Sequence, residues 1–172
     1  MPKVIDNIRG RAISEAREIL IREGYAALTI REIARRLGIG LGTIYNYFKD
    51  KESLMAAVMI QDWMNEQKAT REELMQAESL REGLLYICRG IRNFCLLYQK
   101  AWNSYSAGSE FSKRYRERHE MLLAQITEII RGLYERFDEP CEDHRITLYA
   151  ELIIAGAQHP EIREEEIIEI IV

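Results

Sequence analysis

The side chains that most often carry catalysis are scattered through this sequence. Its three histidines, His119, His144 and His159, lie far apart, and neither a GxSxG turn nor a phosphate-binding P-loop is present. Cys141 and His144 stand three residues apart, but Pro140 places them at a helix start. A solvated helix cap explains them better than a metal site. The sequence therefore predicts no catalytic residue, no metal and no cofactor.

Charge is distributed unevenly along the chain. Residues 1–51 contain ten Lys/Arg and six Asp/Glu, whereas residues 52–172 contain 14 and 22, so the net charge of −4 combines +4 with −8. Salt screens charges over about 10 Å, so a bound molecule responds mainly to the local charge. The basic N-terminal part can therefore bind phosphates although the whole chain is acidic.

Two short helices with a glycine turn between them are predicted in this basic part. Thr29 and Glu32 form a capping-box pattern, and apolar residues then recur at helical spacing: Ile30, Ile33, Ala34 and Leu37. Gly38 sits where a left-handed residue is needed, and a second helix is expected over about residues 41–48. This is the geometry of a helix-turn-helix, whose second helix can enter the major groove. An ordinary helical hairpin has the same periodicity, so both interpretations remain open at this point.

The residues themselves indicate a family. Residues 25–54, YAALTIREIARRLGIGLGTIYNYFKDKESL, closely resemble the N-terminal motif of the TetR family of repressors. Glycine, apolar and polar positions all agree, and the resemblance extends over roughly residues 8–65. It implies an all-α fold, with a three-helix helix-turn-helix DNA-binding domain in residues 1–50. A helical ligand-binding and dimerisation domain would then occupy residues 51–172.

The resemblance implies a set of phosphate contacts. Tyr45 and Tyr47 look like tyrosines whose hydroxyls donate to the DNA backbone, although Tyr45 is also explained as a partly buried spacer between helices. Thr29 and Arg31, at the start of a helix, look like contacts to a neighbouring phosphate, since a helix N-terminus favours an anion. Lys51 looks like a further anchor. Contacts of this kind set the register of the protein but carry no sequence information.

Three residues of the second short helix are expected near the base edges. Gly42 and Thr43 stand at its start, where the family's side chains or backbone approach the bases. Asn46 follows at an outward position. An Asn there can pair bidentately with adenine, and a solvent-facing or phosphate-touching Asn explains the position equally well.

The sequence departs from the family at Gly40 and Leu41. The family often has Ser before the recognition helix and a basic or polar residue next. Gly40 is a weaker cap, and Leu41 offers at most an apolar contact to a thymine methyl group. Leu41 could instead pack inward, seven residues before Phe48. Specificity at this base pair is therefore open.

The rest of the chain agrees with the family in helical character only. Helices are expected over residues 78–100, 113–137, 145–158 and 161–172, after a fourth helix that Asp50 caps. In similar proteins the last two helices pair with their twins in a dimer. Packing within one chain is the alternative. The surface expected to approach the partner contains Leu148, Leu152, Ile153, Ala155 and Gly156.

The body is also rich in amphipathic aromatic residues. Such side chains suit a cavity that binds a flat or hydrophobic molecule. Packing in the core is the alternative explanation for each of them taken individually. The expected lining residues of an effector pocket are Tyr86, Cys95, Tyr98, Trp102, Tyr105, Tyr134 and Tyr149.

The sequence thus predicts a ligand-responsive transcriptional regulator, most simply a repressor, that binds palindromic operator DNA as a homodimer. The three cysteines form no CxxC, and the N-terminus resembles no signal peptide. The longest apolar run, Leu54–Ile60, is far shorter than the roughly 20 residues that span a bilayer. A cytoplasmic location without membrane contact is therefore expected. The alternative function is a helical protein-binding module with a vestigial DNA head.

Overall fold

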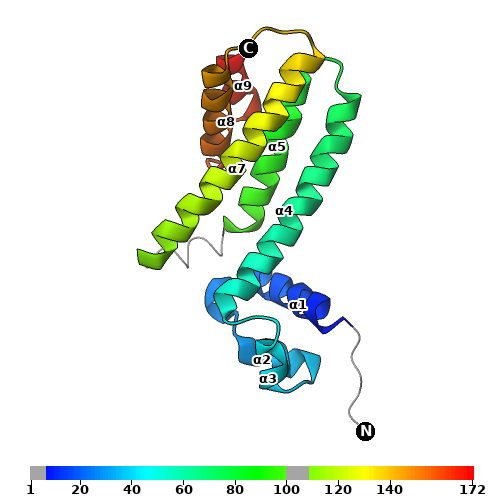
Figure 1. The fold of residues 1–172 in the computed structure, drawn as a ribbon, viewed down its shortest axis with the longest axis vertical. Coiled ribbons are helices and arrows are strands. Elements are labelled where there is room, and N and C mark those ends of the chain that lie inside the picture. Colours follow the sequence, from blue (N-terminus) through cyan, green and yellow to red (C-terminus); the bar gives the residue numbers. More distant parts are fainter. Residues whose placement is uncertain (1–6, 100–108) are drawn as a thin grey trace. The chain divides into compact units, whose positions relative to one another are not determined.

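The computed structural model describes residues 7–99 and 109–172, with the backbone alone for residues 109–118, and within these ranges it is entirely helical (Figure 1). The expected all-α fold is confirmed. The elements, in order, are α1 (Ile8–Arg22), the 3₁₀ helix η1 (Tyr25–Ala27), α2 (Ile30–Leu37), α3 (Leu41–Tyr45), α4 (Lys51–Gln76), α5 (Leu80–Leu97), α7 (Ser109–Arg136), α8 (Asp143–Ala157) and α9 (Glu164–Ile171).

Internal contacts divide the chain into two compact units. Of the described residues, one unit holds 7–64 with 97–99, and the other holds 65–96 with 109–172. Helix α4 therefore contributes its first part to one unit and its second part to the other. The expected division into a DNA-binding domain in residues 1–50 and a ligand-binding and dimerisation domain in residues 51–172 stays a prediction.

The first unit is built around the apolar faces of four helices. Ile19 of α1, Ile33 of α2, Ile44 of α3 and Leu54 of α4 are all completely buried. Gly24 ends α1 with a φ of 87°, a backbone conformation that side-chain-bearing residues rarely adopt. Helices α1, α2 and α3 all contact one another. They provide the fixed base from which the outer faces of α2 and α3 are presented.

The turn between α2 and α3 follows the expected glycine chemistry. Gly38 has a φ of 67° and closes α2, with its amide donating to the carbonyls of Ala34 and Arg35. Helix α3 ends at Tyr45, so the expected helix over residues 41–48 was too long. Phe48 is nevertheless 3% exposed, because its amide still donates to the Ile44 carbonyl and the tight turn keeps both side chains on one face.

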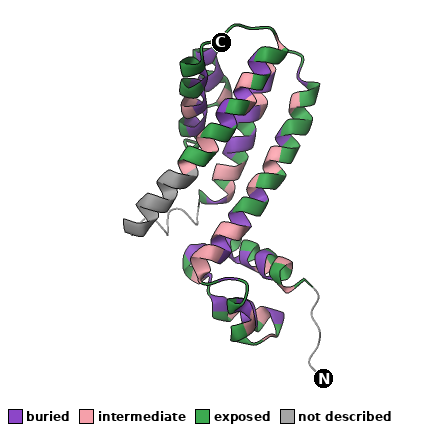
Figure 2. Ribbon diagram, viewed as in Figure 1, coloured by how far each residue is buried: buried purple, intermediate pink, exposed green. Residues whose placement is uncertain are grey.

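The second unit contains closely packed helices. Helix α7 packs on α8, and α8 packs on α9. A Cβ atom added at Gly156 of α8 would lie 2.4 Å from Ile167 Cδ1 of α9, so glycine is needed for this approach. Figure 2 shows buried residues along the inner faces of this unit. Gly156 and Ile153, which were expected to face a partner, are buried within the chain.

Helix α4 continues to Gln76, beyond the point near Gln67 where the apolar periodicity of the sequence becomes unclear. Most residues from 68 to 76 are exposed, and Thr70 is the buried exception. Because few of these side chains enter a core, no apolar stripe marks this part of the helix.

In the described residues, no helix is both long and apolar enough to cross a membrane.

Candidate nucleic-acid interface

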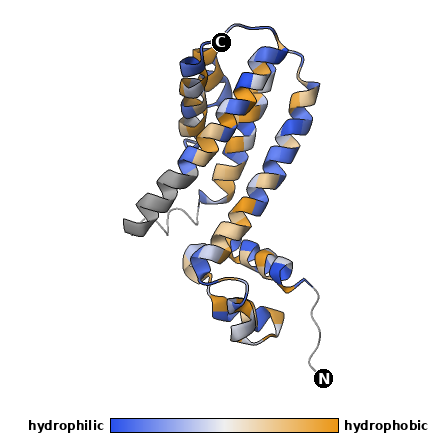
Figure 3. Ribbon diagram, viewed as in Figure 1, coloured by the Kyte–Doolittle hydropathy of each residue, from blue (hydrophilic) through white to orange (hydrophobic). Residues whose placement is uncertain are grey.

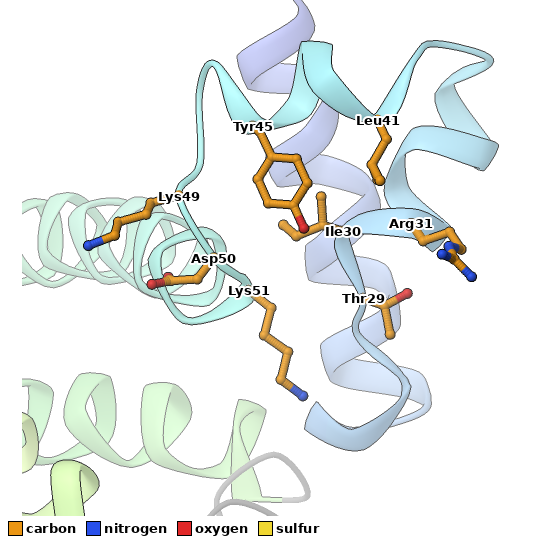
Figure 4. A pocket seen from close by; sticks show the side chains of 8 residues that line it. All are labelled: Thr29, Ile30, Arg31, Leu41, Tyr45, Lys49, Asp50 and Lys51. Carbon is orange, nitrogen blue, oxygen red and sulfur yellow. The ribbon is translucent and has the colours of Figure 1, made fainter.

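A surface hollow of about 360 Å³ lies where the starts of α2, α3 and α4 meet (Figure 4). Eight residues line it: Thr29, Ile30, Arg31, Leu41, Tyr45, Lys49, Asp50 and Lys51. Four of the predicted contacts, Thr29, Arg31, Tyr45 and Lys51, are therefore brought together. Sequence reasoning did not select Lys49 or Ile30, although Lys49 lies within the matched motif.

The charge of this hollow is positive. Arg31, Lys49 and Lys51 contribute three cations, and Asp50 contributes one carboxylate. The Asp50 carboxylate accepts from the Ser53 amide at 2.7 Å and thereby caps α4, as expected. In residues 7–99 no carboxylate forms an ion pair with the three cations of the hollow. A phosphate could therefore be bound here without first breaking an internal ion pair.

The two other arginines of α2 are used differently. Arg35 and Arg36 both donate to the Glu32 carboxylate, at 2.6 Å and 2.9 Å. Arg36 also reaches Glu15 and Glu23 on and after α1, at 3.6 Å and 3.1 Å. This network joins α1 to α2. The two guanidinium groups thus stabilise the first unit and are less available to DNA.

The capping box at the start of α2 is half formed. The Thr29 hydroxyl accepts from the Glu32 amide at 3.1 Å, as expected. The Glu32 carboxylate is occupied instead by the two arginines, whose hydrogen bonds lower its pKa to about 2. The spacing of Thr29 and Glu32 predicts the full capping box but does not show that the arginines three and four residues after Glu32 bind its carboxylate oxygens instead.

The ion-pair network should make stability depend on pH. The folded-state pKa of Glu32 lies below its ordinary value of 4.5, so its contribution is complete above pH 4.5 and lost as pH falls toward 2. The gap in melting temperature between the wild type and Glu32→Gln should therefore close over this range, as circular dichroism can measure. The control variant Glu72→Gln, at an exposed position of α4, should have nearly the wild-type melting temperature at any pH. A gap that is constant down to about pH 2 would contradict this account.

Lys51 is held in place by Tyr25. Its Nζ lies 3.8 Å from the centre of the Tyr25 ring, and the Tyr25 hydroxyl donates to Glu52 at 2.5 Å. Tyr25 is itself buried. A cation on an aromatic face keeps its charge available to a further anion. The sequence marks Tyr25 only as part of the motif and does not reveal this positioning role.

The remaining predicted DNA contacts lie on the outer side of α3. Gly42 and Asn46 are exposed, Thr43 is partly exposed, and Tyr45 and Tyr47 are 50% and 47% exposed. The interpretation of Tyr45 as a partly buried spacer is therefore less favoured. Asn46 is the C-cap residue that follows α3 rather than a residue within it. The contacts of these residues with DNA stay predictions.

Of the residues expected around an effector, four that the structure describes belong to the second unit: Tyr86, Cys95, Tyr134 and Tyr149. Tyr134 and Tyr149 stack, with centroids 6.4 Å apart. The Tyr86 hydroxyl donates to Glu82 on its own helix. Tyr98 belongs to the first unit, and Cys95 is half-buried on α5. Trp102 and Tyr105 lie outside the described residues, so the pocket as a whole stays a prediction.

Tyr98 takes part in a buried polar contact of the first unit. Its hydroxyl donates to the Asp62 carboxylate at 2.6 Å, and Arg17 Nε donates to the same group at 2.7 Å. Burial raises the pKa of the Tyr98 hydroxyl, so it stays a donor. The contact joins α1, α4 and the segment that follows α5. Among the side chains that the structure describes, no three His, Cys, Asp or Glu residues are placed to hold a metal ion.

The comparisons with known proteins agree with this geometry. Residues 12–58 match the family model for bacterial regulatory proteins of the tetR family. This match identifies the segment from α1 to the first part of α4 as a helix-turn-helix domain of the TetR type.

Two curated relatives show how far the sequence likeness reaches. The HTH-type transcriptional regulator HbdR of Aromatoleum sp. (strain CIB) is 28% identical over 95 residues, which are 55% of this chain and 40% of that protein. The regulator BetI of Cronobacter sakazakii is 34% identical over 116 residues, 63% of this chain and 57% of that protein. The chain spans about half the length of the curated relatives it matches.

The fold itself has solved counterparts. RolR without ligand superposes with a TM-score of 0.68 at 21% identity, covering 95% of this chain and 88% of that one. The TetR family regulator CifR, solved with a 26-base-pair operator duplex, gives a TM-score of 0.63 at 17% identity, covering 99% of this chain and 95% of that one. At these identities the likeness establishes the fold alone.

Proposed function

We propose that this protein is a cytoplasmic transcriptional regulator that binds operator DNA through α2, α3 and the start of α4. The observation that carries the proposal is the hollow whose three cations form no ion pair with the described carboxylates of residues 7–99, directly beside exposed residues of α3. In this arrangement Arg31, Lys49 and Lys51 bind backbone phosphates and thereby orient α3. The bases are then contacted from the side that carries Thr43 and Asn46.

The direct test is selection of duplexes from a random DNA library with the purified protein. The enriched duplex should contain an inverted repeat, and its affinity should fall steeply with salt, with a slope near −0.9 for each phosphate bound. A vestigial head would enrich no sequence and would show no such slope. That outcome would favour the alternative, a helical module that binds a protein partner.

The proposal includes a homodimer formed by α8 and α9. One short helix reads only a few base pairs, whereas two heads related by a two-fold axis read a palindrome. Leu148 of α8 and Ile170 of α9 are 63% and 71% exposed, and Val172 is also exposed. Hydrophobic residues are frequent along both helices (Figure 3). Ala155 is the exposed small residue on α8 that would let a partner helix approach.

A charge placed in this surface should separate the dimer. Leu148→Arg is expected to shift the protein from dimer to monomer in sedimentation equilibrium, because two like charges would face each other across a two-fold axis. Met75→Arg is the matched control, since Met75 is exposed on α4 in the same unit. If both variants remain dimeric, α8 does not form the interface.

Repression and a small-molecule effector complete the proposal. Support for an effector comes from the amphipathic aromatic residues of the body, and from a structural neighbour described as a complex with choline, at 18% identity. An effector acts by binding one conformation of the body better than another, so that the two heads no longer match the operator. Unchanged duplex affinity across a broad metabolite panel would remove the effector from the proposal.

A further inference from the structure

We propose that Leu41 recognises the 5-methyl group of a thymine in the major groove, which makes it a specificity-determining residue of the operator-binding surface. The inference rests on the proposed function. It adds a chemical preference at one base pair, at a position where the sequence departs from the family's usual polar residue.

The position of Leu41 is the first support. It is the first residue of α3 and is 39% exposed, whereas Phe48 is 3% exposed. The alternative that Leu41 packs inward above Phe48 is therefore wrong. Within residues 29–51, all of which the structure describes, Leu41 is the one large aliphatic residue that is exposed. Its exposure is unfavourable in free solution, and an apolar group on the DNA would remove it.

The surroundings of Leu41 leave room for a base. Glycines stand on both sides of it. An added Cβ at Gly42 would meet no atom within 4 Å, and one at Gly40 would meet only the Thr43 hydroxyl, at 3.8 Å. The two residues that flank the leucine in the chain therefore add no side chain of their own beside it. The absence of bulk also lets the start of α3 come close to the groove floor.

The register of the DNA is set by the groups beside Leu41. It lines the same hollow as Arg31, Tyr45 and Lys51 (Figure 4). A phosphate held by these cations fixes the distance from the backbone to the base that lies against Leu41. The thymine methyl is the one apolar group that a base edge presents in the major groove. Leu41 therefore favours thymine and gains nothing from cytosine, adenine or guanine.

Replacing single thymines by deoxyuridine isolates this contact, because only the methyl group is removed. The probes are the duplexes enriched by the wild-type protein, each with one thymine replaced. At one position in each half-site the replacement should weaken wild-type binding about fourfold, the effect of one buried methyl group. The same replacement should weaken DNA binding by the Leu41→Ala variant less than about 1.5-fold, because alanine buries little of the methyl group. Leu41→Met keeps an apolar side chain of similar size and should retain the discrimination.

The possible outcomes separate the inference from the function it rests on. If the wild type enriches duplexes but no deoxyuridine position matters, or if Leu41→Ala keeps the full sensitivity, the inference is wrong and the proposed function stands. If no duplex is enriched, the proposed function itself fails. Leu41→Ala should keep the wild-type melting temperature and salt slope, because Leu41 is exposed and uncharged. A lowered slope would mean that the leucine supports phosphate binding instead.

Discussion

The double variant Arg31→Gln, Lys51→Gln should bind the selected duplex at least about 100-fold more weakly than the wild type near 0.1 M salt. Each head loses two charge-assisted contacts, which are worth about 1.5–3 kcal/mol apiece. The slope of log affinity against log salt should also become shallower, by roughly 3 to 4 for a dimer. Both quantities come from one fluorescence-anisotropy titration repeated at several salt concentrations. The large effect is expected because these cations line the hollow and form no ion pair with the described carboxylates of the head.

The matched control for this variant is Arg35→Gln, Arg36→Gln. It removes the same number of positive charges from the same head, but both of these guanidinium groups are paired with Glu32. We expect less than about a tenfold loss of affinity and little change in slope, together with a lower melting temperature, since the ion pairs between α1 and α2 are lost. Equal losses in the two double variants would mean that overall positive charge, rather than the hollow, binds the DNA.

The largest effect on stability is expected for Phe48→Ala. Its ring is almost completely buried, and it packs with Ile44 in the core of the first unit. Removing it should lower the free energy of unfolding by about 3–5 kcal/mol, because the lost burial is accompanied by a cavity that the surrounding helices fill only partly. Urea unfolding followed by circular dichroism measures this quantity. DNA binding should fall in parallel, because α3 would lose its support.

The neighbouring residue should behave in the opposite way. Tyr47 is half exposed, so Tyr47→Ala should change the free energy of unfolding by no more than about 0.5 kcal/mol. It should nevertheless abolish protection of the operator in a footprint, if its hydroxyl binds a backbone phosphate as the family resemblance implies. Protection that survives in a folded Tyr47→Ala protein would remove this residue from the proposed interface.

Much of the head was predictable from local patterns. The apolar stripe of α2, the left-handed Gly38 and the Asp50 cap each depend on residues within one or two turns of one another, and each is present in the structure. The end of α3 was less predictable. Phe48 continues the apolar spacing of Ile44, and periodicity alone does not distinguish a helical residue from one in a following turn that packs on the same face.

The candidate site was predictable in its members but not in their roles. Side-chain chemistry and the motif marked Arg31 and Lys51. The sequence did not show that Arg35 and Arg36 are paired with Glu32, nor that Lys51 lies on the ring of Tyr25. The effector pocket was least predictable. Aromatic residues at helical spacing are compatible with a core, a cavity or a stacked pair, and Tyr134 and Tyr149 form a stacked pair.

By itself the sequence determined the helical fold and the spacing of the helix-turn-helix, because these follow from short-range periodicity, turn glycines and caps that neighbouring residues specify. The likeness to the TetR family came from the residue motif of the head. Only the tertiary structure decided which cations are free, that Leu41 is exposed while Phe48 is buried, and that Gly156 packs against Ile167 within the chain. These outcomes depend on contacts between side chains that are distant in the sequence. The spacing of residues along the chain does not specify which of those contacts form.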